Sequence, residues 1–327
     1  MPLSAELINS VKEKLNGYDS ITILTHLNPD PDTIGTGLGI YVLLKTHTSK
    51  HVEIVNASQA LPQHLDFLPF FHRIKHKMDY EKSLIISCDC GSLNRLGFDL
   101  KGRDILNIDH HASNTNYGSV NVILPEYASA SQVAYRLFRD IYPVTAESAT
   151  CFYTGLLSDT RYFTTSSVNR EVFRVAGELV DLGADPVLIA RNFTQRRSLA
   201  SLRILERALH SLTLYLEGRV AVLRIGPEDI LATGATMPDM DGIVDYARSL
   251  AIVEIAILLI EQSDGTVRVS LRSKQADVSQ LAAKFGGGGH KVASGFTLKQ
   301  TQTQEIVDTI LEEITILGLI DGKKIQR

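Results

Sequence analysis

The sequence has no surplus of basic residues. Its 33 lysines and arginines are outnumbered by 37 aspartates and glutamates, which gives a formal net charge of -4 and a pI near 6.2. Proteins that follow a long nucleic acid need a basic surface that neutralises many phosphates. The composition therefore argues against a long nucleic-acid tract as partner, but it is compatible with a small anionic ligand that is held locally with the help of a metal.

Long hydrophobic runs and regular cysteine spacings are also missing. The longest apolar run, Leu250 to Ile260, is too short to span a membrane and contains Glu254. The N-terminus has neither the basic region nor the apolar core of a signal peptide. The three cysteines, Cys88, Cys90 and Cys151, form an odd set without the spacing of a disulfide framework. We therefore expect no membrane partner and a reduced, cytoplasmic location.

The chain is long enough for two domains, and its pattern predicts an α/β fold. In the first half of the 327 residues, β-branched strand segments alternate with helical segments. This alternation is typical of a mainly parallel sheet with helices on both faces. We predict a first domain over residues 1–190, a helical linker over 191–217 and a smaller α/β domain over 218–327. The expected strands are 21–24, 51–56, 83–87, 104–108, 219–225, 252–260 and 267–272.

The segment Ile21 to Gly39, ITILTHLNPDPDTIGTGLG, joins a strand to three candidate metal ligands. A β-branched run leads to His26, Asp30 and Asp32. A proline disfavours the helical conformation in the residue before it, so Asn28 and Asp30 are expected to be extended. Residues i and i+2 of an extended segment share a face, which would let the two aspartates point the same way. Asn, Pro, Asp and Gly are equally typical of a plain surface turn, so this segment alone does not decide between a turn and a site.

Further candidate ligands lie at the ends of later elements. The carboxyl ends of parallel strands meet at one edge of a sheet, so we expect these residues to converge on the segment that holds His26. Carboxylates that lie a few ångströms apart cannot all stay ionised without compensation, and two divalent cations would supply it. The further candidates are Asp89 after the strand 83–87, Asp109, His110 and His111 after the strand 104–108, and Asp159 after the helix 145–157.

Oxygen-rich ligation with imidazoles and no thiolate suits Mn²⁺ or Mg²⁺ better than structural zinc. Cys88 and Cys90 flank Asp89 and would suggest zinc. Side chains alternate along a strand, however, so both cysteines should face away from a site that contains Asp89. We predict that they are buried thiols. A pair of ions about 3.5 to 4 Å apart could activate water and hold the oxygens of an in-line phosphoryl displacement.

With these residues in view, the chain resembles the DHH phosphoesterase family, whose signature stands here as Asp109, His110 and His111. The motifs occur in the family's order: HLNPDPDTIG at 26–35, DCGSLNRLG at 89–97, DHH at 109–111 and LLSDT at 156–160. VSLRSK at 269–274 and GGGGHKVASGF at 286–296 resemble the DHH-associated domain that closes over the substrate. The resemblance spans nearly the whole chain. One departure is Thr36, where the family often has serine.

The resemblance implies roles for individual residues. A first ion would be bound by His26, Asp30 and Asp89, and a second by Asp32, Asp89, His110 and Asp159. His111 would face the scissile phosphate as a hydrogen-bond donor or general acid, and Asp109 would orient an imidazole. The cofactors would be two divalent cations, with Mn²⁺ favoured and Mg²⁺ or Co²⁺ as alternatives.

The four consecutive glycines at 286–289 permit two interpretations. Composition alone favours a flexible linker. They lie inside a predicted domain, however, and a backbone without side chains can approach a nucleotide and hold a phosphate with its N–H groups. With the family resemblance we predict a substrate-binding set in which the arginine makes bidentate phosphate contacts. The set is Arg272, Gly286, Gly287, Gly288, Gly289 and His290.

The size and the two-domain plan resemble the branch of the family that degrades very short oligonucleotides and removes phosphate from 3'-phosphoadenosine 5'-phosphate (pAp). The predicted function is therefore a nanoRNase and pAp phosphatase, a hydrolase of short oligonucleotides or nucleoside bisphosphates. The alternatives are a dedicated cyclic- or linear-dinucleotide phosphodiesterase, a manganese inorganic pyrophosphatase, whose second domain lacks the GGGGH element, and a nucleotide-sensing module without catalysis. A homodimer is compatible with the sequence.

Overall fold

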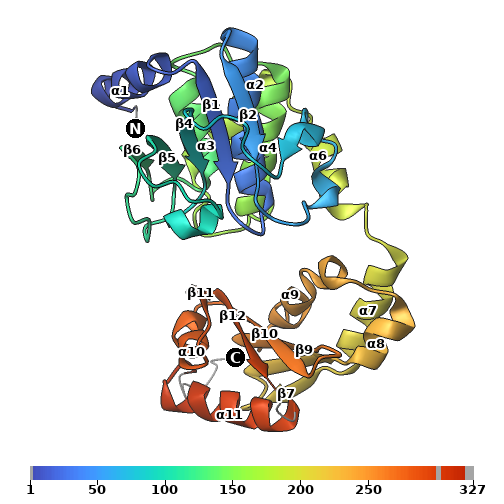
Figure 1. The fold of residues 1–327 in the computed structure, drawn as a ribbon. Coiled ribbons are helices and arrows are strands. Elements are labelled where there is room, and N and C mark those ends of the chain that lie inside the picture. Colours follow the sequence, from blue (N-terminus) through green and yellow to red (C-terminus); the bar gives the residue numbers. More distant parts are fainter. Residues whose placement is uncertain (1–2, 300–302, 321–327) are drawn as a thin grey trace. The chain divides into compact units, whose positions relative to one another are not determined.

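A computed structural model describes residues 3–299 and 303–320 (Figure 1). The chain divides into two compact units, Met1–Arg196 and Arg197–Arg327, and each unit has its own sheet and its own core. The predicted α/β fold class is confirmed. None of the described helices combines the length and the apolar character that a membrane crossing needs. The exact limits of the domains and of the linker stay a prediction.

The first unit is built on a six-stranded parallel sheet with the order β3-β2-β1-β4-β5-β6. The chain adds β2 and β3 on one side of β1 and then crosses to place β4, β5 and β6 on the other side. In such sheets, ligands bind beyond the carboxyl ends of the strands where the order reverses, here between β1 and β4. The strands are β1 (Ser20–Thr25), β2 (His51–Val55), β3 (Ile74–Lys75), β4 (Leu84–Cys88), β5 (Ile105–Asp109) and β6 (Val120–Ile123).

The helices are distributed unequally between the two faces of this sheet, and the α-helices pack on one face. The main core joins one face to the α-helices, whereas the short 3-10 helix η3 (Leu93–Leu96) and connecting loops cover the other face with a smaller core. The α-helices are α1 (Ala5–Asn16), α2 (Pro31–His47), α3 (Ala130–Phe138), α4 (Ala146–Asp159), α5 (Arg170–Asp181) and α6 (Pro186–Thr194). Two further 3-10 helices are η1 (Gln63–Leu65) and η2 (Phe71–Arg73).

Asp104, just before β5, attaches α1 to the sheet. Its Oδ2 accepts hydrogen bonds from Tyr18 Oη at 2.5 Å and from Lys14 Nζ at 2.9 Å. These bonds, led by that of Tyr18, lower the pKa of the Asp104 carboxyl to about 2. A carboxyl whose pKa is lower in the folded than in the unfolded state stabilises the fold only while it is ionised.

Asp104→Asn is therefore expected to destabilise the protein in a pH-dependent way. The difference in melting temperature from the wild type should be largest above about pH 4, the ordinary range of an aspartate, and should shrink as the pH falls to about 2. Thermal melts between pH 2 and pH 7 measure it. Asp181→Asn, which changes an exposed aspartate at the end of α5, is the control and should have little effect at any pH. A constant difference for Asp104→Asn would contradict the assignment.

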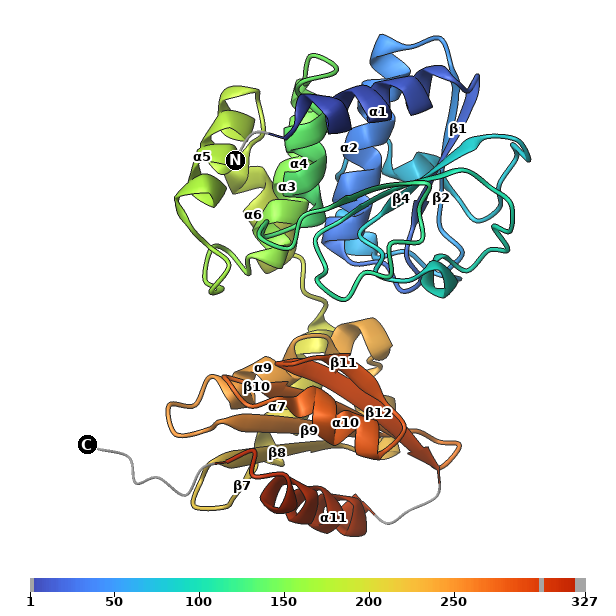
Figure 2. The same cartoon turned by 90° about the vertical axis from the view of Figure 1, so that its left-hand side faces the viewer.

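The second unit has a six-stranded mixed sheet with the order β11-β12-β10-β9-β8-β7, in which only β8 and β9 pair in parallel. α10 (Val278–Lys284) and α11 (Thr303–Ile316) close the core on one face (Figure 2). On the other face, α7 (Leu199–His210), α8 (Pro227–Thr233), η4 (Met237–Met240) and α9 (Ile243–Arg248) surround a second core, which contains side chains of β8 and β9. The strands are β7 (Thr213–Tyr215), β8 (Val220–Ile225), β9 (Ile255–Glu261), β10 (Thr266–Ser273), β11 (Gly288–His290) and β12 (Ala293–Lys299).

One segment differs from the expected local structure, and the structure of another decides between two interpretations. Residues 213–215, at the end of the expected helical linker, form the edge strand β7, because Thr and Tyr suit a strand and β8 offers an edge for pairing. The four glycines are not a flexible linker, since Gly288–His290 form β11 and pair with β12. Both strands are short, and they depend on a partner strand rather than on their own propensity.

Candidate active site

The segment after β1 places Asp30 at the start of α2. The helix begins at Pro31, and Asp30 Oδ1 caps it by accepting hydrogen bonds from the N–H groups of Asp32 and Thr33, each at 3.0 Å. The predicted extended conformation of Asp30 is confirmed (φ -98°, ψ 176°). The same prediction for Asn28 is wrong, because its φ is 53°, in the left-handed region that asparagine tolerates. Asp32 lies within the helix, so the two aspartates do not share an extended face as predicted.

Asp89 comes after β4 in the left-handed conformation, with φ at 54°. This turn breaks the alternation of the strand, so Cys88 joins the main core and Cys90 joins the smaller core on the opposite face. The prediction that both thiols are buried and free is confirmed, but simple alternation is not the reason. The conformation directs the Asp89 carboxylate, only 2% exposed, to the carboxyl edge of the sheet.

The structure brings together all eight site residues that were predicted in the first unit. Asp89 lies at the centre of the cluster. Its Oδ2 is 3.6 Å from His26 Nε2, which is also 3.5 Å from Asp30 Oδ2. Its Oδ1 is 3.5 Å from His110 Nε2, which in turn is 3.3 Å from Asp159 Oδ2 and 4.0 Å from Asp32 Oδ2. The cluster thus has ligand atoms around His26 and around His110, and the two oxygens of Asp89 lie within 3.6 Å of these two rings.

The donor atoms fit divalent cations. Two ligand atoms that are each about 2.1 Å from one ion lie at most about 4.2 Å apart, and the separations of 3.3 to 4.0 Å fall within this limit. His26 Nδ1 lies 2.9 Å from the Leu27 carbonyl oxygen and His110 Nδ1 lies 3.3 Å from that of Tyr127. A carbonyl only accepts, so His110 Nδ1 carries the proton and His110 Nε2 presents a lone pair to the cluster. At His26, Nδ1 lies near both the Leu27 carbonyl and the donating guanidinium of Arg95, at 3.3 Å from Arg95 Nη2.

The charge of the cluster also calls for cations. Burial, and then the negative charges of Asp32 and Asp30, raise the pKa of Asp89 and of Asp159 well above the usual range. Burial likewise raises the pKa of Asp32. Asp89 Oδ1 is buried and accepts no hydrogen bond from any described residue. An ionised, buried oxygen without a donor is costly, and a bound divalent cation would satisfy it.

His111 lies against Asp109 and, less closely, against Asp89, whose Oδ1 is 3.5 Å from His111 Nδ1. Its Nδ1 lies 2.7 Å from Asp109 Oδ1, which also accepts hydrogen bonds from the backbone N–H groups of His110 and His111. Asn114 Nδ2 donates to Asp109 Oδ2 at 2.5 Å. Burial acts to raise the pKa of Asp109, but the bonds from His111 and Asn114 outweigh it and lower the pKa. Sequence reasoning missed Asn114, because nothing in its local pattern distinguishes it from a turn residue.

Comparison with known proteins identifies the family. The model of the DHH family, N-terminal domain, matches residues 20–156, and that of the DHHA1 domain matches residues 217–315. The chain is 31% identical over 322 residues to the bifunctional oligoribonuclease and PAP phosphatase NrnA of Thermus thermophilus, a match that covers 96% of this chain and 93% of the relative. The chain belongs to the DHH family. The predictions of this family and of a hydrolase are confirmed.

Two further relatives agree with the family assignment. The Bacillus subtilis protein with the same description is 25% identical, over 96% of this chain and 98% of that protein. The crystal structure of an exopolyphosphatase-related protein from Bacteroides fragilis has a TM-score of 0.89 at 27% identity, and the match covers 96% of this chain and 98% of that one. The similarity therefore extends over both units of this DHH-family chain.

The N-terminus of α3 holds Asp32 in this DHH-family site. The backbone N–H of Ala130 donates to Asp32 Oδ2 at 2.7 Å, and that of Ser131 donates to Oδ1 at 3.0 Å. These N–H groups have no partner within their helix, and they favour a negative charge. Gly155 of α4 lies against the same carboxylate, since a Cβ there would be 2.6 Å from Asp32 Oδ1. Sequence reasoning missed this support, although Ser129 is recognisable as an N-cap.

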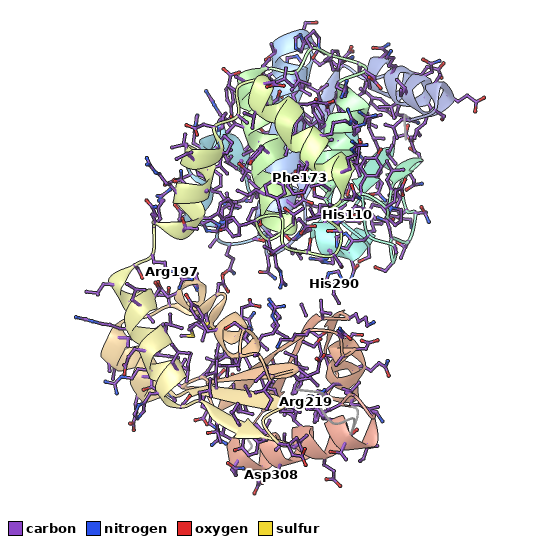
Figure 3. The ribbon with its side chains drawn as sticks, turned by 180° about the vertical axis from the view of Figure 1, so that it is seen from behind. His110, Phe173, Arg197, Arg219, His290 and Asp308 are labelled. Atoms are coloured by element: carbon purple, nitrogen blue, oxygen red, sulfur yellow. The ribbon has the colours of Figure 1, made fainter. Side chains whose placement is uncertain are left out.

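The predicted substrate-binding residues belong to the second unit, where Figure 3 labels His290. His290 on β11 pairs with Ala293 on β12, and Ala293 pairs with Arg272 on β10. Directly paired residues of antiparallel strands share a face, so Arg272 and His290 lie on the same face of the sheet. Among the glycines, Gly287 contacts β12 so closely that a Cβ would be 2.2 Å from the Gly295 carbonyl oxygen, whereas a Cβ at Gly288 would meet nothing within 4 Å.

Proposed function

We propose that this DHH-family hydrolase cleaves very short oligoribonucleotides and removes phosphate from pAp, with the help of two divalent cations, most favourably Mn²⁺. The observation that carries the proposal is the Asp89 carboxylate, whose two oxygens face His26 and His110 in two separate ligand groups. The names of the relatives from Thermus thermophilus and Bacillus subtilis support the choice of substrates. Oxygen ligands combined with imidazoles support the choice of Mn²⁺.

The proposed ligand sets correspond to the two groups of atoms. His26, Asp30 and Asp89 would hold one ion, and Asp32, His110 and Asp159 would hold the other. Asp89 is the proposed shared ligand, since its Oδ1 lies 3.5 Å from His110 Nε2. When bound, such ions would lower the pKa of a water molecule and neutralise charge on the phosphate. The chain's own part is to fix the ligands: Asp30 is fixed by the start of α2, Asp32 by the start of α3, and His110 by the Tyr127 carbonyl.

His111 is the proposed contact to the scissile phosphate. The Asp109 carboxylate can only accept at 2.7 Å, so His111 Nδ1 carries the proton of that hydrogen bond. The ring's other nitrogen, Nε2, would then donate to the phosphate or protonate the leaving oxygen when the ring carries both protons. In the second unit, Arg272, His290 and the backbone of Gly286–Gly289 would bind the rest of the substrate.

A substrate panel tests the proposal. Purified protein with Mn²⁺ is offered pAp, the dinucleotides pApA and pGpG, the trinucleotide pApApA and inorganic pyrophosphate, and phosphate and nucleoside products are measured. We expect turnover of pAp and of the short oligonucleotides, and its loss with a chelator. Turnover confined to pGpG would instead favour the dinucleotide phosphodiesterase, and turnover confined to pyrophosphate the pyrophosphatase. Tight pAp binding without product in Mn²⁺ would favour a nucleotide-sensing module.

A further inference from the structure

The sheet of the second unit has one face that its helices leave partly polar. Along β10, Val267, Val269 and Leu271 point into the core beneath α10 and α11. The alternate residues Arg268, Ser270 and Arg272 must point to the opposite face. On that face, the second core includes residues of β8 and β9 but none of β10 or β12. A polar strip therefore runs along β10, beside the helix-covered half of the sheet.

Strand pairing arranges this strip in three rows. The first row contains His290, Ala293 and Arg272, the second contains Gly288, Gly295 and Ser270, and the third contains Thr297 and Arg268. The middle row is almost bare backbone. A Cβ at Gly288 would enter open space, and one at Gly295 would lie 2.8 Å from the Val269 carbonyl oxygen. The middle row therefore projects little from the sheet, and it lies between a row with Arg272 and His290 and a row with Arg268.

Arg268 is available to a ligand. Its side chain is exposed, and the described residues provide it with no hydrogen-bond or ion-pair partner. Other arginines of the same unit are engaged: Arg248 Nε pairs with Asp245 at 2.9 Å, and Arg224 donates to Gln304 at 2.7 Å. Burial raises the pKa of Asp241, and the positive charges of Arg268 and Arg272 act against this rise.

Arg268 and Arg272 leave the backbone of β10 at well-separated points. Four residues along a strand span about 13 Å, whereas both N–H groups of one guanidinium reach the oxygens of one phosphate at about 2.9 Å. We propose that Arg268 forms a second phosphate subsite, which contacts a phosphate farther along the substrate than the one bound at Arg272 and His290. This inference rests on the proposed function and extends it to substrate length. The middle row, with Gly288 and Gly295, leaves room for the nucleoside that joins the two phosphates.

The subsite predicts a dependence on the number of phosphates. In pAp one phosphate is removed and one remains, whereas in pApApA two phosphates remain besides the one under attack. Only the longer substrate can use both cationic rows. A hydrogen bond to a charged group contributes enough to change affinity roughly 10-fold or more.

Arg268→Ala is therefore expected to lower the ratio of kcat/KM for pApApA to kcat/KM for pAp by about 10-fold. A plot of log KM for pApApA against log salt concentration should also become shallower, by about 0.7 for one lost phosphate contact. A purely structural role would not change this slope. Arg203→Ala removes an exposed arginine of α7 and serves as the matched control, which should leave both the ratio and the slope unchanged.

The outcomes separate the subsite from the proposed function. If the wild type hydrolyses neither pAp nor short oligonucleotides, the proposed function fails and the subsite fails with it. The wild type can be active while Arg268→Ala lowers kcat/KM for pApApA and for pAp by the same factor, or lowers neither. Only the subsite is overturned by that result. Melting curves of Arg268→Ala test whether the variant is folded. We expect a wild-type melting temperature, because the side chain is exposed on a strand.

Discussion

Asp89→Asn is expected to abolish hydrolysis while making the metal-free protein more resistant to heat. Asparagine keeps the shape of the side chain and tolerates the left-handed conformation that residue 89 adopts, so backbone strain should not contribute. Loss of a carboxylate that both ligand groups share should cost more than the roughly 100-fold typical of residues that only support a metal ligand. Activity in Mn²⁺ measures this effect.

The gain in stability results from the raised pKa of Asp89. A carboxyl whose pKa is higher in the folded than in the unfolded state weakens the fold as the pH rises from about 4 through the folded value, because the folded site resists ionisation. Asparagine removes that charge. Melting in the presence of a chelator at pH 7 should therefore show a rise of about 2–4 °C for each kcal/mol relieved. Asp181→Asn is the control, and retained turnover or a lower melting temperature for Asp89→Asn would contradict the shared site.

Gly155→Ala is expected to weaken metal binding although residue 155 is no ligand. Its Cβ would lie 2.0 Å from Ser131 Oγ and 2.6 Å from Asp32 Oδ1, so α3 or the carboxylate must move. Displacement of Asp32 from the N–H groups of Ala130 and Ser131 should reduce Mn²⁺ affinity roughly 10- to 100-fold. Titration calorimetry and the rise in melting temperature on adding Mn²⁺ measure the change independently of activity.

Two further variants separate this effect from a general loss of stability. Gly177→Ala places a methyl group on α5 in open space, so it should stabilise the helix by about 0.5–1 kcal/mol and leave Mn²⁺ affinity unchanged. Adding Ser131→Ala to Gly155→Ala removes the clash with the hydroxyl but not the one with Asp32, so it should restore part of the affinity. Wild-type Mn²⁺ affinity in Gly155→Ala would show that Asp32 does not depend on this packing.

The strands that carry the site were predictable because their signal is local. The β-branched runs of β1, β4 and β5 lead directly to Asp or His, and parallel strands bring the residues at their carboxyl ends to one edge of the sheet. The positions of His26, Asp89 and Asp109 could therefore be predicted from the sequence alone. The edge strands β7 and β11 could not, because three residues, among them glycines, form a strand only when a neighbour offers an edge.

The supports of the site were harder to predict than its ligands. The hydrogen bonds from Ala130 and Ser131 to Asp32 join residues about 100 positions apart, and they depend on how α3 lies against α2. The local sequence pattern also did not predict the backbone conformation of Asn28 and Asp89. Both are left-handed, and this conformation depends on the whole turn and not on the residue alone. Spacing rules therefore identified the candidate ligands, while only the assembled fold shows which groups fix them.

The crossed order of the first sheet has a consequence for how this unit folds. β1 pairs with β4, whose residues come some 60 positions later, so the central pair closes only after a long loop has been ordered. The cluster draws on side chains from His26 to Asp159, and it cannot exist before that closure. Divalent cations would then act on the finished unit, slowing its unfolding rather than nucleating its folding.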